Sequence, residues 1–277
     1  MEEKVIMGYS IFTDTMADMN WETVEEKGKA GVPILFPLGV IEQHGPHLPL
    51  GTDIYYSYAI CHKIREKVLE KGKEVLIAPP YYWGINHCTG AFPGTFSLKP
   101  DTMKLVLADI FQNFSMWGFR KIYCINYHGD PLHIRTILEA ASTANREYGM
   151  EVRFLMEPYE LAEHGLSGEE DYCMVDGAEY PPELFENDGT GLDIHAGAFE
   201  TATIKHFYPD MPDEELAKKL PDCSLNDSTI QSWFTGGEEA RKVVPFGYAG
   251  NPAGYEKQLE TVGRIYEILC EYVADKI

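Results

Sequence analysis

Basic residues are scarce in this sequence of 277 residues: 23 Lys and Arg stand against 44 Asp and Glu, which gives a formal net charge of −21. Such an excess of negative charge repels phosphate backbones and anionic membrane surfaces, so neither nucleic acid nor a membrane is expected as a partner. In the alternative interpretation, the acidic residues only form a solubilising surface. The charge excludes classes of partner but names no substrate.

Long apolar runs and paired cysteines are also missing. The longest apolar stretch, residues 31–41, contains two prolines and is too short to cross a bilayer as a helix. The amino terminus lacks the basic segment and apolar stretch of a secretory signal. The six cysteines are scattered and include no Cys-x-x-Cys pair, which argues against a disulfide scaffold and a zinc ribbon. We therefore expect a cytoplasmic protein with free, mostly buried thiols.

Several familiar motifs are absent as well. The sequence has no Gly-x-Gly-x-x-Gly after a predicted strand and no Gly-x4-Gly-Lys-Ser/Thr loop, so a nucleotide-binding α/β protein is not expected. It also lacks a Gly-x-Ser-x-Gly elbow and a His-Glu-x-x-His helix. Because these two motifs are absent, the sequence does not have the pattern of a serine hydrolase with such an elbow or of a zinc peptidase with such a helix.

Apolar strand patterns alternate with amphipathic helical patterns along the chain. The predicted strands are 32–40, 75–78, 121–126 and 152–156, and the predicted helices begin at Asp53, Asp101, Pro131 and Tyr255. This alternation indicates βαβ units, hence a three-layer, Rossmann-like α/β fold with a mainly parallel sheet. We expect one domain over 1–277. The acidic segment 157–190 is loop-rich and lacks clear periodicity, and it is expected to edge a pocket or to form a subunit contact.

Histidine and carboxylate side chains gather in two loops that follow predicted strands. Glu42 and His44 come after the first strand, and alternate residues of an extended chain face the same side, so both can point into one pocket. His128 and Asp130 follow a later strand. Ligands of open α/β sheets bind at the carboxyl ends of strands. These two loops are therefore the first candidates for a site.

The same kinds of side chain recur at Asp53, which closes the first loop, and at His195 and Glu200, which lie five residues apart. Mixed imidazole and carboxylate ligands suit zinc, manganese or iron, and a bridging carboxylate allows two ions about 3.5–4 Å apart. Asp53 is the candidate bridge. Two ions activate a shared water, which permits hydrolysis without a protein nucleophile. In the alternative interpretation, Asp53 only caps the following helix and His44 bonds a loop carbonyl.

Four segments of the sequence resemble the signature blocks of the creatininase (creatinine amidohydrolase) family, in their usual order. They are EQHGPHLPLGTD, FPGTFSL at 92–98, GFRKIYCINYHGD and HAGAFET. The blocks span 37–201, with a weaker match at 250–252. On these blocks the chain is identified as a member of the family.

The resemblance implies metal ligands, position by position. Glu42, Asp53 and His128 match the ligands of one metal in that family, while His44 and the shared Asp53 match ligands of the second. The family thus implies two divalent ions per chain, which would be zinc, manganese or iron.

One further ligand and a pocket histidine are implied in the same way. The remaining ligand is Glu200 or Asp130, because some members use the Glu of the last block and creatininase itself has a Glu two positions after its metal-binding His. We favour Glu200. His195 matches the pocket histidine of the family and is a candidate proton donor to the leaving nitrogen. In the alternative interpretation, His195 is bonded at a helix start.

The resemblance also implies a fold and a reaction. The family fold is a Rossmann-like layer structure, commonly a hexamer, and its members open a cyclic amide, remove a formyl group or trim a peptide. We therefore predict a homo-oligomeric amidohydrolase that cleaves a C–N bond of a small-molecule amide. The alternatives are a metal-dependent deformylase or peptidase and a non-catalytic binding or regulatory member of the same fold.

The sequence departs from creatininase in its pocket. Creatininase closes two tryptophans over its ring from the segment between the blocks of His128 and His195, but that segment has no Trp here, so creatinine is not the expected substrate. Trp83, His87 and Tyr127 are predicted to contact the substrate, and the alternative is that they only pack. Four histidines that match no block are expected on the surface or on helix faces: His62, His133, His164 and His206.

Overall fold

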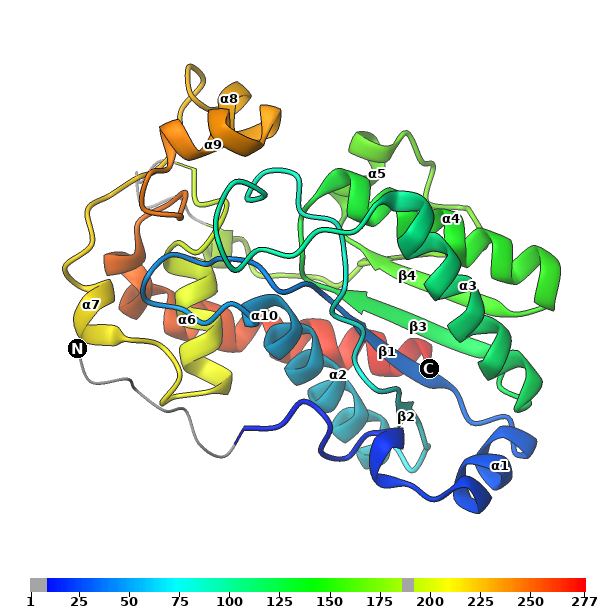
Figure 1. Cartoon of the computed structure of the whole chain (residues 1–277). Helices are drawn as coiled ribbons and strands as arrows, with labels where there is room; N and C mark the ends of the chain where they lie inside the picture. The colour runs from blue at the N-terminus through cyan, green and yellow to red at the C-terminus, as the bar shows by residue number, and fades with distance from the viewer. Residues whose placement is uncertain (1–8, 186–191) are drawn as a thin grey trace.

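A parallel sheet of five strands lies at the centre of the structure, a computed structural model that describes residues 9–185 and 192–277 (Figure 1). The strands are β1 (Ile34–Leu38), β2 (Leu76–Ile77), β3 (Lys121–Asn126), β4 (Glu151–Met156) and β5 (Cys173–Val175). Their order across the sheet is β2-β1-β3-β4-β5, and every pair of neighbours is parallel. The predicted α/β fold with a parallel sheet is confirmed.

Helices connect the strands and cover the sheet (Figure 1). The α-helices are α1 (Trp21–Lys29), α2 (Thr52–Glu70), α3 (Pro100–Met116), α4 (Pro131–Tyr148), α5 (Pro158–His164), α6 (Ala198–Phe207), α7 (Glu214–Ala217), α8 (Ile230–Thr235), α9 (Gly237–Val243) and α10 (Tyr255–Lys276). The 3-10 helices are η1 (Met16–Asp18), η2 (Pro182–Phe185) and η3 (Pro252–Gly254). None of the described helices has the length and apolarity that a membrane crossing needs.

Both faces of the sheet are apolar because successive strand residues point to opposite sides. Ile34, Phe36 and Leu38 of β1 belong to a core shared with α3 and α4, whereas Leu35 belongs to a second core shared with α2, α6 and α10. All residues of β1 are buried, as expected of a parallel strand that is covered on both faces. The helices therefore form two outer layers, and the fold has the three layers that were predicted.

The structure differs from the predictions in two local features. Asp53 does not cap α2: the N-cap is Gly51, no side chain caps the helix, and Asp53 lies buried in its first turn. The segment 157–190, predicted to be loop-rich, also contains α5, η2 and the edge strand β5, which the sequence pattern did not predict. Residues 186–190 of that segment lie outside the described part.

The strand order places two loops side by side at the carboxyl edge of the sheet. β2 lies on one side of β1 and β3 on the other, so the winding of the chain reverses between β1 and β3. At such a switch point the loops that follow the two strands separate and open a crevice, which is where α/β proteins bind ligands. The loops after β1 and β3 are the ones that carry Glu42, His44 and His128.

Ion pairs join the exposed faces of α2 and α10. The carboxylate of Glu267 pairs with Lys63 at 2.6 Å and with Lys67. One turn further on, Lys71 pairs with Glu271. The hydrogen bonds from Lys63 and Lys67 lower the pKa of Glu267 to about 2, against the opposing effect of burial.

The variant Glu267→Gln is expected to lower the free energy of unfolding by about 0.5 kcal/mol near neutral pH, since exposed ion pairs contribute little. The pKa of Glu267 in the folded state is below its unfolded value of about 4.3, so the stabilisation is present above about pH 4.3 and is lost as the pH falls toward about 2. Urea unfolding at about pH 7, 5 and 3 measures the difference. Glu260→Gln, an exposed position of α10, is the control. A difference that does not shrink with falling pH would contradict this account.

Candidate metal centre

Five titratable side chains from separate parts of the chain converge beside this crevice. Glu42 and His44 lie in the loop after β1, His128 in the loop after β3, Asp53 in the first turn of α2 and Glu200 in the first turn of α6. The first four are at most 7% exposed. Burying carboxylates is costly unless they face cations or ligate a metal. The convergence is therefore the feature of the fold that demands a chemical explanation.

The carboxylate of Asp53 lies between two imidazoles. Its Oδ1 is 3.0 Å from Nε2 of His44, and its Oδ2 is 3.1 Å from Nδ1 of His128. Each oxygen thus faces a different ring. This is the arrangement that a carboxylate needs to bridge two ions.

Two groups of potential ligands share Asp53. In the first, Oε1 of Glu42 is 2.9 Å from Nδ1 of His128. In the second, Oε2 of Glu200 is 3.9 Å from Nε2 of His44. Donor atoms that surround one ion at 2.0–2.1 Å lie about 3 Å apart, so both groups have spacings suitable for a metal.

Hydrogen bonds to backbone carbonyls fix both imidazoles in the orientation of metal ligands. Nε2 of His128 donates to the carbonyl of Ile85 at 2.9 Å, and Nδ1 of His44 donates to the carbonyl of Glu42 at 3.1 Å. The nitrogen that faces the carboxylates is in each case the other one. Metal-binding histidines are typically held in this way by their second nitrogen.

The donor set fits a divalent metal. Oδ2 of Asp53 is buried and makes no hydrogen bond, although His128 lies within contact distance, so the geometry there suits coordination better than hydrogen bonding. Imidazole and carboxylate ligands are those of zinc, manganese and iron sites. The residues present can therefore hold such ions.

Electrostatic interactions favour positive charge at the centre of the cluster. Burial lowers the pKa of His44, but the charge of Asp53 and the hydrogen bond to it raise the pKa to about 10. Burial is likewise outweighed at His128, whose pKa the nearby carboxylates of Glu42 and Asp53 hold well above its usual value. In the opposite sense, the two histidines hold the pKa of Asp53 below its usual range despite burial. The carboxylates therefore stabilise a cation here, whether proton or metal.

Glu200, and not Asp130, completes the second group. Burial raises the pKa of Glu200 to about 7, and its Oε2 accepts a hydrogen bond from the amide of Ala196 at 2.5 Å. Asp130 lies outside the cluster. Its Oδ1 caps α4 by accepting the amides of Leu132 and His133, and its Oδ2 accepts the amide of His87 at 2.6 Å. Because Asp130 belongs to none of the described groups of potential metal ligands, the structure favours Glu200 over Asp130.

His195 lies at the edge of the cluster and is held from several sides. Its ring centroid is 4.4 Å from that of His44 and 5.5 Å from that of Trp233 in α8. Its backbone pairs with Ala249 through hydrogen bonds of 2.8 and 3.2 Å, and its Nε2 donates to the carbonyl of Gln43 at 2.8 Å. Burial, followed by the charge of His44, lowers the pKa of His195 to about 4. The ring is therefore neutral near pH 7.

The sequence pattern did not single out several side chains that support the cluster. Thr89 donates a hydrogen bond to Glu42, and the buried His47 bonds Thr201 through Nε2 at 2.9 Å. For these residues, the one available sequence signal was that His47 lies inside the first signature block, EQHGPHLPLGTD. His133, predicted on the surface or a helix face, is completely buried, because both ring nitrogens bond groups beside the site.

A cavity of about 530 Å³ borders the cluster. His128 and Glu200 line it, together with Tyr127, one of the three predicted substrate contacts. The rest of its wall comes from residues of α2, β3, β4, α5, η2, α6 and α10 and from the loops beside them. The segment 157–190 thus edges a pocket, as predicted. The part of it that lines the pocket includes residues of α5 and η2.

The other two predicted substrate contacts do not line this cavity. Trp83 is 44% exposed and packs edge-on against Phe96, with ring centroids 5.4 Å apart. His87 is exposed, and its backbone carbonyl accepts the amide of Gly237 at 3.2 Å. Both residues follow a strand, but their backbones carry the side chains away from the cluster.

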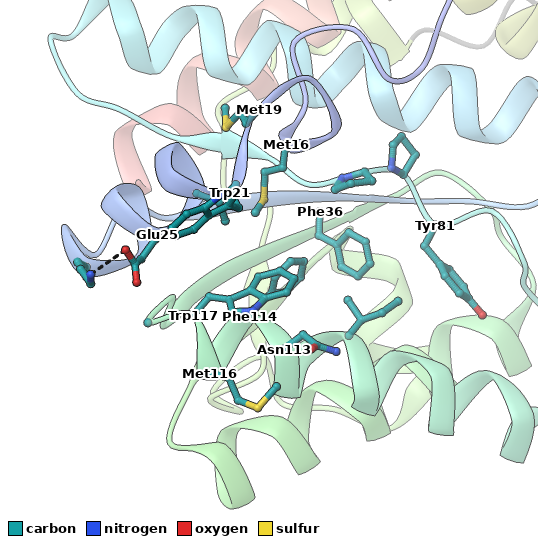
Figure 2. A pocket seen from close by; sticks show the side chains of 16 residues that line it. Met16, Met19, Trp21, Glu25, Phe36, Tyr81, Asn113, Phe114, Met116 and Trp117 are labelled. Atoms are coloured by element: carbon teal, nitrogen blue, oxygen red, sulfur yellow. Dashed lines mark ion pairs between the residues drawn. The ribbon is translucent and has the colours of Figure 1, made fainter.

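A larger cavity, of about 930 Å³, lies among η1, α1 and α3 and shares no lining residue with the cluster (Figure 2). Its wall is apolar, with Met16, Phe36 and Phe114 among the side chains that Figure 2 shows. Its charged residues, Glu25 and Lys29, pair with each other at 2.9 Å. The cavity offers space without groups for catalysis.

Replacing Asp130 separates its capping role from metal binding. Asp130→Ala is expected to destabilise the protein by about 1 kcal/mol through the lost cap, while Asp130→Asn, which can still cap, has a much smaller effect. Neither variant is expected to lose bound metal. Thermal unfolding and elemental analysis measure the two properties. Loss of metal from Asp130→Asn would return this residue to the set of ligands.

Comparison with known proteins agrees with the geometry. A model of the creatininase family, described as creatinine amidohydrolase, matches residues 17–277. The chain is 27% identical over 232 residues to the creatinine amidohydrolase of Pseudomonas putida, which covers 79% of this chain and 80% of that protein. It is 28% identical over 223 residues to the mycofactocin precursor peptide peptidase of Mycobacterium ulcerans, which covers 79% and 74% respectively.

Solved structures share the fold over nearly the whole chain. A crystal structure of creatinine amidohydrolase (creatininase) is 24% identical, with a TM-score of 0.70 over 95% of this chain and 96% of that one. A structure named "Creatininase Mn" is 22% identical, with a TM-score of 0.68 over 95% and 97%, and a creatininase variant of Zn-Zn type is 21% identical, with a TM-score of 0.65 over 98% of both. Since the family model also matches all but a short amino-terminal part of the sequence, this chain belongs to the creatininase family.

Proposed function

We propose that this chain is a metal-dependent amidohydrolase that holds two divalent ions with Asp53 as their shared ligand. The observation that carries the proposal is that the two oxygens of this carboxylate face different imidazoles, at 3.0 and 3.1 Å. Related structures named for manganese and for a Zn-Zn pair support the metals. Relatives named as an amidohydrolase and a peptidase support a C–N bond as the target.

In this proposal Glu42, Asp53 and His128 hold one ion, and His44, Asp53 and Glu200 hold the other. Divalent ions in such a centre activate a water for attack and polarise the scissile carbonyl. The protein contributes ligands whose orientation is fixed before substrate arrives, since both imidazoles are bonded to backbone carbonyls. It also excludes bulk water, because four of the five side chains are buried.

His195 is proposed to move the proton. Its Nε2 carries a hydrogen that is donated to the carbonyl of Gln43, so in the neutral ring Nδ1 is the atom able to accept a proton. Nδ1 can take the proton of the attacking water and pass it to the leaving nitrogen, which then departs as an amine. Trp233 and Ala249 hold the ring in position for this transfer.

The substrate is proposed to be a small-molecule amide that enters the cavity beside Tyr127. The volume of about 530 Å³ is within the usual range for small-molecule sites. A homo-oligomeric state, possible hexamer formation and a cytoplasmic location remain predictions of the family resemblance.

Elemental analysis of the purified, untagged protein is expected to find about two divalent ions per chain. Asp53→Ala should reduce the content to near zero, because it removes the ligand common to both groups, whereas Glu42→Ala and Glu200→Ala should each leave about one ion. His62→Ala is the control, since this surface residue pairs only with neighbouring exposed carboxylates. An Asp53→Ala protein that keeps both ions would refute the shared ligand.

His195→Ala is expected to lower kcat about 10²–10⁴-fold without changing the metal content, because it removes a proton carrier and no ligand. The assay uses metal-loaded protein with a panel of lactams, formamides, small amides and short peptides. His206→Ala, in α6, is the control. His195 also lies close enough to Glu42 and His44 to form a metal group, so loss of metal from the variant would make it a ligand instead.

A further inference from the structure

Aromatic rings and carboxylates form the wall of the cavity beside the metal centre. Its aromatic residues include Tyr56, Tyr127, Tyr180, Phe185, Phe199 and Tyr266. Its carboxylates are Glu157, Glu160, Asp193 and Glu200. No Lys or Arg is among the described residues that line it. This combination is typical of sites that recognise an organic cation.

The aromatic rings pack against one another in two sets. Tyr56 and Tyr127 stack with ring centroids 3.9 Å apart and an angle of 13° between their planes. Tyr266 meets Tyr127 edge-on at 6.1 Å, and Tyr180 meets Phe185 at 5.6 Å. Tyr56 and Tyr266 are buried, so Tyr127, Tyr180 and Phe185 are the rings of these sets able to receive a cation on a face.

Two of the carboxylates lie together at the start of α5. Glu157 and Glu160 form a capping box, in which Oε2 of Glu160 accepts the amide of Glu157 at 2.7 Å. Neither forms an ion pair with a basic side chain of the described residues. Burial, followed by the charge of Asp176, raises the pKa of Glu157 to about 7, and burial likewise raises that of Glu160 to about 7. Ionising these two carboxylates therefore costs free energy, and a bound cation would reduce that cost.

A hydrogen-bonding group in the same wall has no partner. The hydroxyl of Tyr127 is buried and makes no hydrogen bond within the protein. Burial raises its pKa far above the usual value, so the hydroxyl stays protonated and can donate a hydrogen bond. A buried polar group without a partner is costly, so it is expected to bond a ligand.

We propose that the substrate carries a protonated amine, which Glu157, Glu160 and the aromatic wall bind while the scissile amide lies at the metal centre. The inference rests on the proposed function. Both ends of such a molecule find their partners in one cavity, because His128 and Glu200 line it as well. The net charge of −21 also favours the approach of a cation.

A set of matched amides tests whether the enzyme prefers a substrate with a protonated amine. Aminohexanamide, hydroxyhexanamide and the half-amide of adipic acid differ only in the group at the far end of the chain. The metal-loaded enzyme is expected to show a kcat/KM at least about tenfold higher for the amine than for the hydroxyl compound, and the lowest value for the carboxylate. The double variant Glu157→Gln, Glu160→Gln should bring the ratio of amine to hydroxyl near one, mainly through KM. Glutamine can still cap α5 through its oxygen.

The control is Glu163→Gln, which changes an exposed carboxylate of α5 outside the cavity and should leave the ratio as in the wild type. Binding is measured separately by saturation-transfer NMR with phenethylamine and phenylethanol. Tighter binding of the amine, weakened about tenfold in the double variant, supports amine recognition even if no amide of the panel is cleaved. Cleavage without preference for the amine overturns this inference and leaves the proposed function standing. Equal binding of the two probes without cleavage also overturns it.

Discussion

The burial of Asp53 is the constraint on which the rest of the site depends. A carboxylate that is 1% exposed needs positive charge close to each oxygen, and His44 and His128 provide the nitrogens that face it. Two loops and the first turn of α2 must therefore meet at one point. The carbonyl of Glu42, in the loop after β1, and that of Ile85, in the segment after β2, then orient the two rings. The segment after β2 therefore also supports the site. Helix α2 begins without a side-chain cap because its N-cap residue is Gly51.

The topology of the sheet brings the candidate ligands together and determines which segments of the chain form the site. Reversal of the winding between β1 and β3 brings together the loops that carry Glu42, His44 and His128. The later part of the chain supplies different functions: α6 brings Glu200, and α5 and α10 wall the cavity. Most of the candidate ligands thus come from the earlier part of the chain, and much of the cavity wall comes from the later part. Because the wall can change while the ligands stay, this arrangement gives a physical reason why relatives are named for different activities, an amidohydrolase and a peptidase among them.

Much of this architecture could be predicted from the sequence, because buried parallel strands and amphipathic helices leave strong periodic patterns. Residues 121–126 form β3 as predicted, and α10 ends one residue before the predicted end. The errors have local causes. Asp53 has the residue type and position of a helix cap, but two imidazoles stabilise it better than backbone amides would. Strand β5 is only three residues long, which is too short for the residue pattern of a strand to be recognised in the sequence. Trp83 and His87 follow a strand, yet position along the chain does not determine where a side chain points.

The two ligand groups differ in when they become available to a growing chain. The members of the first group lie within the amino-terminal half of the sequence, and the last of them is His128. The second group also needs Glu200, which is synthesised much later, and Ala249 must follow before His195 can be held in place. A nascent chain therefore presents one complete set of ligands while the other is still missing. If the proposed function holds, metal capture during synthesis would be stepwise, and the first ion could organise the strand-end loops before the second group of ligands is made.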